Sequence, residues 1–419
     1  MFKSLLSMQC DDFYFLYLFL IFLTVSCESV STVNNSGEFA STFGLVGAEQ
    51  ASVVAATPEG GIFIGGRTNS LRGQYDLYLV LFNKNMKSVW AKTLGGNYFD
   101  ELTDAVVDEE GYIYIIGTIC RSSADTNAVV GKLSPDGNLV WTYEVEGPSS
   151  TYGVALDMGT DESVTGVAYE KTVLQEDGHV LVFRISDDGK LIWQESVTSD
   201  IPIEPKDILI TPADDIFIGG QTIQNTPYSS YSDAFLIKMN NLGQTTWLKT
   251  YHSLIDSATG LIPNRDVARA LAFESSGHIV IAASSLLSFP HYGHTDFWFV
   301  RVDLDGNIIM QTKYREQFRE DAFPILRPHA LSRLSNGDYI VSGRFYDRFV
   351  GPRYQMWVAR FTAQGSAVWS KHYGDALDDE GMGVEVIRNS IYSAGYTFTD
   401  SNSTDIYLLK LDLNGNVKQ

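Results

Sequence analysis

Acidic residues recur along the chain, each group shortly before an apolar run that reads as a strand. The candidates for a shared site are Asp100, Glu101, Asp266, Asp321, Asp379 and Glu380. Carboxylate oxygens are the ligands that hard cations prefer, so these side chains could hold Ca²⁺ if they all faced one cavity. If they face outward, they are solvated residues that cap strand ends. The residue types alone leave both interpretations open.

A second group combines arginine with aromatic residues and histidine in two polar loops. Its members are His291, Tyr292, His294, Arg344, Tyr346, Arg348, Arg353 and Tyr354. Arginine and aromatic side chains are enriched at protein-binding surfaces, so we interpret this group as part of a binding face. His291 and His294 alone do not make a zinc site, because a third ligand is missing.

Local motifs of known catalytic types are absent from the sequence. The chain contains no GxSxG, no HExxH and no glycine-rich phosphate loop. Two carboxylates from distant segments could still meet in space, as they do in glycoside hydrolysis. We therefore expect a binding protein more than an enzyme, and we expect no cofactor unless the acidic group holds calcium.

The segments that must position these residues share one sequence motif. It consists of a turn with Gly, two or three further residues, Trp, and then a strand of alternating residues. It reads DGNLVWTYEV from Asp136 and DGKLIWQESV from Asp188. The anchor residues are Trp90, Trp141, Trp193, Trp247, Met310 and Trp369, at spacings of 51, 52, 54, 63 and 59 residues. A period of this size indicates a repeat architecture. Since Met shares bulk with Trp but not its chemistry, we expect these side chains to fill space between neighbouring units.

Each repeat contains four strand signals. In the second unit the apolar run from Asp104 to Asp108 is followed by Tyr112–Ile119, Ala128–Leu133 and Leu139–Val145. Short runs rich in aromatic and β-branched residues, bounded by Gly, Asp and Asn, indicate strands. Four antiparallel strands in about 50 residues is the size of one β-propeller blade.

The two ends of the repeat series predict the number of blades. The last unit has three strand signals, whereas Gly37–Gly44 has the form of a fourth strand without partners. Phe39 lies 51 residues before Trp90, at the Trp position. We therefore predict an all-β, seven-bladed β-propeller of four-stranded antiparallel blades over residues 37–419, closed by an N-terminal strand that completes the last blade. Closure removes exposed strand edges.

Antiparallel connectivity places the loops on two faces. The short turns between first and second strands, and between third and fourth strands, share one face. The longer second-to-third and blade-to-blade loops share the opposite face, which we call the long-loop face. Both candidate groups fall there, so we expect ligands at this face and at the mouth of the central channel.

The N-terminal residues have the pattern of an export signal. The apolar run Phe13–Leu23 is too short to span a bilayer, which needs about 20 residues, but it fits a signal peptide. A small residue before Cys27 resembles a lipoprotein signal box. We expect residues 1–26 to be the signal, Cys27 to carry lipid and residues 27–36 to be a flexible tether. Plain secretion, an uncleaved anchor and a start at Met8 are the alternatives.

The formal net charge of -21 argues against nucleic acid as a partner, because phosphate binding requires basic clusters. The same charge disfavours flat binding to anionic lipid, so we expect contact with the membrane only through the N-terminal lipid. We expect a monomeric ring in the cell envelope.

The phrase DGNLVWTYEVEG, together with the strand YIYIIGT, resembles the repeat of bacterial seven-bladed β-propellers found in secreted proteins and lipoproteins. The resemblance covers about residues 37–419. It implies the fold and an extracytoplasmic location, and it supplies no functional residues. Three functions stay open. We favour a scaffold that binds an envelope protein, with glycan or small-ligand binding second and a carbohydrate-active enzyme third.

Overall fold

The structure is a computed structural model. It describes residues 30–31, 40–45, 47–69, 74–122, 125–171, 178–225, 230–253, 265–287, 294–316, 324–347, 353–374, 377–399 and 403–418. Within these ranges the regular elements are strands, and no helix is long and apolar enough to cross a membrane. The predicted signal peptide, Cys27 and Phe39 lie outside the described residues.

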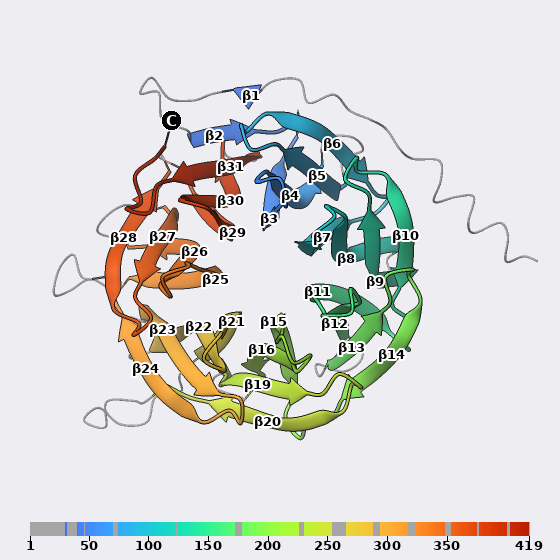
Figure 1. Ribbon diagram of the computed structural model, residues 1–419, viewed down its shortest axis with the longest axis vertical. Coiled ribbons are helices and arrows are strands. Elements are labelled where there is room, and N and C mark those ends of the chain that lie inside the picture. The colour runs from blue at the N-terminus through green and yellow to red at the C-terminus, as the bar shows by residue number, and fades with distance from the viewer. Residues whose placement is uncertain are drawn as a thin grey trace, which may run out of the picture.

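Seven four-stranded antiparallel blades form a closed ring around a central axis (Figure 1). In six blades the first strand along the chain lies innermost and the fourth lies outermost, whereas the outermost strand of the seventh blade comes from the N-terminal end of the chain. The strands of blades 1 to 4 are β3 (Glu49–Ala56), β4 (Ile62–Thr68), β5 (Asp76–Phe82) and β6 (Ser88–Leu94); β7 (Asp100–Val107), β8 (Ile113–Ser122), β9 (Asp125–Leu133) and β10 (Leu139–Glu144); β11 (Ser150–Met158), β12 (Val164–Lys171), β13 (His179–Ile185) and β14 (Leu191–Val197); β15 (Ile203–Ile210), β16 (Ile216–Thr222), β19 (Ala234–Met239) and β20 (Thr245–Tyr251).

The remaining blades follow the same order. Blades 5 to 7 consist of β21 (Arg265–Glu274), β22 (His278–Leu287), β23 (His294–Asp303) and β24 (Ile308–Tyr314); β25 (Ile325–Arg333), β26 (Tyr339–Tyr346), β27 (Gln355–Phe361) and β28 (Ala367–Tyr373); β29 (Asp379–Ile387), β30 (Ser390–Phe398), β31 (Thr404–Leu411) and β2 (Ala40–Phe43). Blade 4 also carries a small hairpin of β17 (Gln224–Asn225) and β18 (Ser230–Tyr231). The predicted fold class and blade number are confirmed.

The N-terminal strand closes the ring, as predicted. β2 pairs antiparallel with β31, from Ala40↔Leu409 to Phe43↔Ile406, and becomes the fourth strand of blade 7. Two residues of the segment expected to be a tether are described. Val30–Ser31 form the short strand β1 against the outer side of β2. The outermost strand of a blade has an unpaired edge, and such an edge accepts another strand readily.

The hydrophobic core is divided into clusters that lie between neighbouring blades. One cluster joins Val182 of blade 3 to Ile218 of blade 4, and another joins Tyr392 of blade 7 to Ile62 of blade 1. Each blade therefore buries its two faces against its neighbours, and its stability depends on the closed ring.

The repeated Trp residues contact the next blade, as the sequence predicted. Trp90, Trp141 and Trp193 donate the indole N–H to a carbonyl in the third-to-fourth turn of the following blade, over 2.8–3.0 Å. Trp369 donates in the same way, at 2.9 Å, to the carbonyl of Leu413, which follows the third strand of blade 7. At the Met310 position, Arg301 of β23 supplies the missing donor, since its Nη2 donates to the carbonyl of Ala363 in blade 6.

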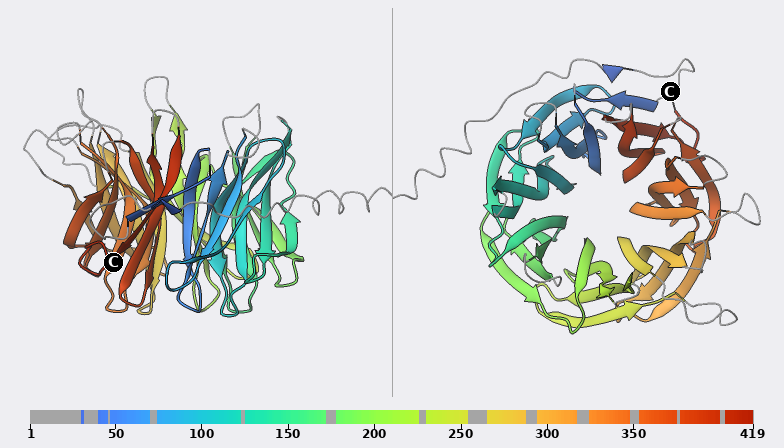
Figure 2. Two further views of the ribbon diagram at one scale, coloured as in Figure 1. Left: turned by 90° about the horizontal axis from the view of Figure 1, so that it is seen from above. Right: turned by 180° about the vertical axis from the view of Figure 1, so that it is seen from behind.

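The two kinds of short turn lie together on one face of the ring, in the lower half of the left view of Figure 2. The innermost strands run between that face and the long-loop face. Each innermost strand carries a β-bulge at the same place, at residues Ser52, Thr103, Val154, Lys206, Arg269, His329 and Met382. A bulge re-aims the side chain at that position, and here all seven side chains are partly exposed on the innermost strands.

Candidate functional site

Three of the acidic candidates are buried at the starts of innermost strands. Asp100 accepts hydrogen bonds from the backbone N–H groups of Gly96, at 2.6 Å, and Cys120, at 2.8 Å. Asp266 accepts one from Ser253 N–H at 2.7 Å, and Asp379 is also buried. Burial raises the pKa of Asp100 to about 6. The carboxylates of Asp100 and Asp266 therefore fasten the preceding loop to the strand, and they are buried rather than solvated.

The carboxylates of the other described acidic candidates lie against cations. Glu101 forms an ion pair with Arg67 at 2.8 Å, and Glu380 forms one with Arg344 at 3.2 Å. Asp321 lies outside the described residues. Within the described ranges, no three His, Cys, Asp or Glu side chains are placed together to hold a metal ion.

The predicted binding group divides into separate parts. His291, Tyr292 and Arg348 lie outside the described residues. His294 is buried next to Arg315, which also pairs with Asp296 at 2.7 Å. This arrangement belongs to the interior of blade 5.

Arg344, Tyr346 and Tyr354 do come together on blade 6. The Arg344 guanidinium lies 4.6 Å from the centre of the Tyr354 ring, and the two Tyr rings are 5.1 Å apart. Arg353 is more exposed and pairs with Asp378 at 3.4 Å. The structure therefore brings together part of the predicted face.

Sequence reasoning missed the residues of the innermost strands that join this group. Arg344 is the register partner of Arg327 on β25, and Arg269 and His329 occupy the bulge positions of β21 and β25. We call Arg269, Arg327, His329, Arg344 and Glu380 the mouth cluster. Arg327 and Glu380 lie near the starts of their strands and Arg344 near the end of its strand, which places them toward the long-loop face.

The mouth cluster carries more positive than negative charge. His329 Nε2 lies 2.8 Å from Glu380 Oε1, and Tyr396 donates its hydroxyl to Glu380 Oε2 at 2.5 Å. Burial would raise the pKa of Glu380, but its contacts with His329, Arg344 and Tyr396 lower it to about 2. One carboxylate therefore faces three guanidinium groups.

The arginines of the cluster also repel one another electrostatically. Burial, together with the charges of Arg327 and Arg344, lowers the pKa of Arg269 to about 10. Burial and Arg344 likewise lower the pKa of Arg327. Like charges held in a half-buried site repel each other, and this arrangement favours any anion that can reach them.

A second set of ionisable residues lies on the innermost strands of blades 2 to 4. Asp104 Oδ2 accepts the N–H of Leu156 at 3.0 Å, and Asp207 Oδ2 accepts that of Leu271 at 2.6 Å, each from the next blade. Asp157 binds Ile210 N–H in the same way at 2.6 Å.

These three carboxylates join neighbouring blades. In each one the other oxygen accepts the N–H of the residue that follows the Asp. Burial raises the pKa of Asp104 to about 7 and that of Asp157 to about 6, and it raises the pKa of Asp207 well above its usual value. Because both oxygens hold backbone groups, the carboxylates satisfy strand edges that would otherwise be unpaired.

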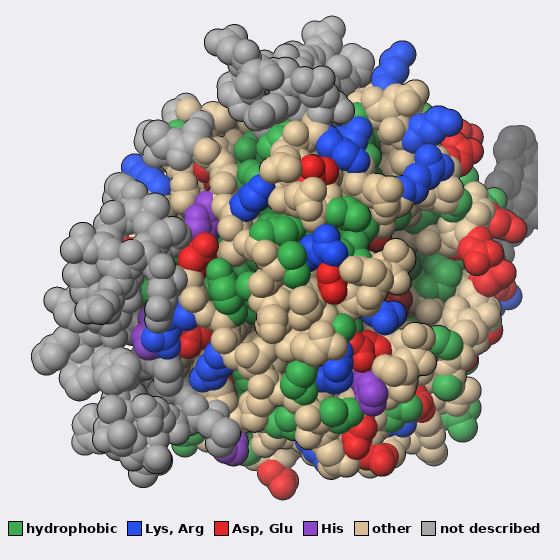
Figure 3. Space-filling model, turned by 60° about the vertical axis from the view of Figure 1, so that its left-hand side comes forward, with side chains coloured by type: hydrophobic (Ala, Val, Ile, Leu, Met, Phe, Trp, Pro, Cys, Tyr) green, Lys and Arg blue, Asp and Glu red, His purple; other side chains and the backbone are tan. Residues whose placement is uncertain are grey.

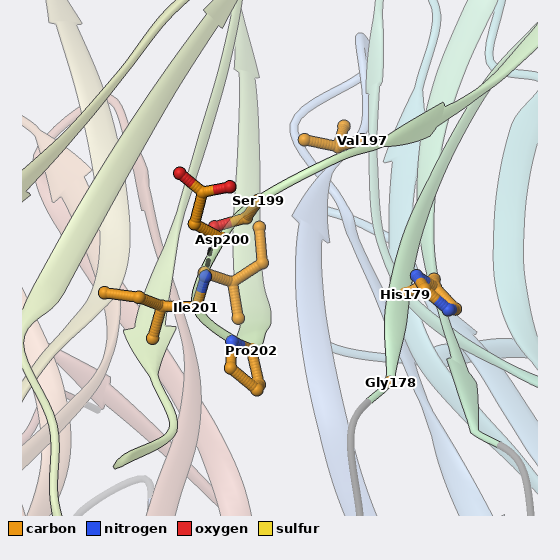
Figure 4. Close-up of a pocket in the computed structure, with 8 residues that line it drawn as sticks. Gly178, His179, Val197, Ser199, Asp200, Ile201 and Pro202 are labelled. Atoms are coloured by element: carbon orange, nitrogen blue, oxygen red, sulfur yellow. Dashed lines mark hydrogen bonds between the residues drawn. The ribbon is translucent and has the colours of Figure 1, made fainter. Parts of the chain in front are cut away.

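A small cavity of about 180 Å³ lies beside blades 3 and 4 (Figure 4). Its ionisable lining residues are His179 and Asp200, which stand on opposite walls in the figure and do not face each other. The cavity therefore lacks a paired acid and base. Figure 3 shows side chains of both charges scattered over the visible face, without a large area of one sign.

No protein-family model and no curated protein sequence matches the chain. Solved structures do match. An ulvan lyase of polysaccharide lyase family PL25, bound to -[GlcA(1-4)Rha3S]-, shows 10% identity and a TM-score of 0.57 over 90% of this chain and 97% of that one. The chain is a β-propeller. An α-L-arabinanase of Penicillium chrysogenum, complexed with arabinobiose, shows 10% identity and a TM-score of 0.51 over 74% of this propeller and 92% of the enzyme. At this level of identity the likeness concerns the fold alone.

Proposed function

We propose that this propeller is a binding module of the cell envelope that holds a partner protein on its long-loop face. One observation carries the proposal. The mouth cluster and the adjoining Tyr346 and Tyr354 combine arginine and aromatic side chains at one place on that face. These residue types dominate the energetics of protein interfaces.

The described carboxylates support binding over catalysis. Asp104, Asp157 and Asp207 have raised pKa values on innermost strands, and each holds two backbone N–H groups. Burial also raises the pKa of Glu385 on β29 to about 7, and its carboxylate accepts the N–H of Val386. A general acid or a nucleophile needs an oxygen directed at a substrate. These residues instead serve the fold.

The proposal includes the location of the protein. Removal of residues 1–26 would leave Cys27 as a lipidated first residue, and the ring would be attached through the segment that precedes β2. Lipid would then be the sole membrane contact, because a net charge of -21 is repelled by an anionic surface.

The experiment is crosslinking in cells followed by pull-down of the tagged full-length protein, with Cys27→Ala and Tyr354→Ala variants. We expect a stoichiometric partner whose recovery falls with either variant, and we expect Cys27→Ala to leave the membrane fraction. Tyr143→Ala, on the outermost strand β10, is the control and should retain the partner. A membrane-attached protein without any partner would refute the scaffold proposal.

Glycan binding is the second candidate, favoured by the Tyr346 and Tyr354 rings beside Arg344. Aromatic faces next to a cation suit a sugar that carries an acidic group. Calorimetry with neutral and uronic-acid oligosaccharides tests this candidate. Binding that is lost in Tyr354→Ala would support a glycan ligand in place of a protein.

A further inference from the structure

We propose that the mouth cluster is a carboxylate-binding site and that the partner inserts an acidic side chain there. The inference rests on the proposed function, since it names the group by which the long-loop face would recognise its protein partner. The site is formed by three guanidinium groups from β21, β25 and β26, which belong to two adjacent blades.

The first argument is the lack of neutralising charge. Among the described residues, Arg344 has an ion pair with Glu380, whereas neither Arg269 nor Arg327 has one. Arg269 donates from Nε to Ser284 Oγ at 3.0 Å, which fixes the side chain without neutralising it. Glu204, whose charge also acts on Arg269, is already paired with Lys206 at 2.7 Å.

The second argument is position. Both Arg269 and Arg327 are partly exposed on innermost strands. Arg327 lies near the start of β25, toward the long-loop face, and Arg269 lies at the bulge in the middle of β21. The chain as a whole is strongly acidic, with a formal net charge of -21. Arginines held together in a partly buried site repel one another, and burial also costs them part of their hydration. A bound anion would relieve both costs.

The third argument is the shape of the groups. A guanidinium presents parallel N–H donors that match the two oxygens of a carboxylate, and such bidentate pairs are the strong ones. A carboxylate is therefore the ligand group of choice. An acidic protein segment is the ligand that the proposed function requires, and its Asp or Glu side chains present such carboxylates at the end of a short, flexible chain.

The test uses the full-length protein without its partner, so that it stays separate from the pull-down. Glutarate and a short poly-glutamate peptide are the carboxylate probes, and sulfate, chloride and a uronic-acid oligosaccharide are compared at constant ionic strength. We expect the carboxylate probes to raise the melting temperature. In Arg327→Gln we expect their affinity to fall about tenfold or more, which corresponds to the loss of one charged hydrogen-bond pair.

Two further measurements make the result decisive. Arg121→Gln, near the long-loop end of β8 in blade 2 and outside the cluster, should bind the probes as the unmodified protein does. Without probe, Arg327→Gln should be at least as stable as the unmodified protein, because one source of repulsion is gone.

A probe response that survives in Arg327→Gln, or that is absent from the unmodified protein, would overturn the site. Response to the oligosaccharide alone would overturn the protein ligand. A probe response without any partner in cells would leave the site standing and refute the scaffold.

Discussion

The indole of Trp141 in blade 2 lies against Gly189 in the third-to-fourth turn of blade 3. Trp141 Nε1 donates to the carbonyl of Asp187 in that turn at 2.8 Å. A Cβ atom at Gly189 would lie 2.8 Å from the indole ring, and the residue has a φ of +83°. The Gly and the Trp of the repeated phrase therefore meet across the boundary between blades.

Gly189 is required both for its left-handed backbone conformation and for the close approach of the Trp141 indole. Replacement of Gly189 by Ala, compared with a control glycine, should separate the two effects. Gly277→Ala is the matched control, because Gly277 has a φ of +80° and nothing within 4 Å of the added Cβ. We expect about 1–2 kcal/mol of destabilisation from the left-handed backbone in both variants. Gly189→Ala should cost about 1–3 kcal/mol more through overlap with the indole. Chemical denaturation measures both, and equal losses would contradict the packing role of Trp141.

Arg301 replaces an absent Trp, and its removal should be costly. Arg301→Met leaves the buried carboxylate of Glu274, 2.7 Å away, without its cation and leaves the Ala363 carbonyl without a donor. We expect a loss of about 2–4 kcal/mol in the free energy of unfolding.

Arg360→Met is the comparison for Arg301→Met. Arg360 donates to the carbonyl of Leu413 at 3.1 Å, but Trp369 donates to the same oxygen at 2.9 Å. The loss in the free energy of unfolding should therefore be smaller in Arg360→Met than in Arg301→Met. If both variants lose the same free energy, Arg301 does not substitute for the indole.

The inward aspartates should make stability depend on pH. The pKa of Asp104 is raised to about 7 in the folded state, mainly by burial, so the folded protein binds more protons than the unfolded chain between pH 4 and 7. Its contribution to stability therefore falls as the pH rises through this window. In Asp104→Asn the free energy of unfolding should change less between pH 4 and 7.

The exposed turn residue Asp136 supplies the control for this measurement. Asp136→Asn should retain the pH dependence of the unmodified protein. Identical pH profiles for Asp104→Asn and the unmodified protein would show that Asp104 is ionised at the same pH in both states.

Ring closure should depend on Phe43 of β2. Phe43 is buried and packs edge-on against Phe82 of blade 1, with ring centres 5.2 Å apart. Phe43→Ala should lower the free energy of unfolding by about 3–5 kcal/mol. Val140→Ala, at a residue 52% exposed on β10, should have little effect. Thermal unfolding of both variants checks the contrast, and a small loss at Phe43 would mean that closure contributes little.

The sequence predicted the blades because each needs the same local chemistry. Tight turns with Gly and strands rich in β-branched residues can be read without knowing what lies nearby. The sequence-based prediction also placed β2 correctly in the last blade. The start of β7 was predicted at Asp104, but the strand begins at Asp100. A strand with charged residues at both ends does not reveal its limits.

The candidate site was harder to predict because side-chain direction on the innermost strands depends on a bulge. The extra residue interrupts the alternation that sequence patterns rely on, so the pattern did not reveal whether Asp100 faces the channel or its own loop. The signal that would have found the mouth cluster is the presence of Arg269, Arg327 and His329 inside otherwise apolar strands.

β2 is both the strand that completes blade 7 and the element that follows the proposed lipid tether. A mechanical pull from the N-terminal side would first separate β1 from β2 and would then reach the pairing of β2 with β31 before it reached any other blade. The load would fall on the four register pairs from Ala40↔Leu409 to Phe43↔Ile406. Under tension the ring would open at the seam where it closes, and rupture there would expose the edge of β31 to other chains.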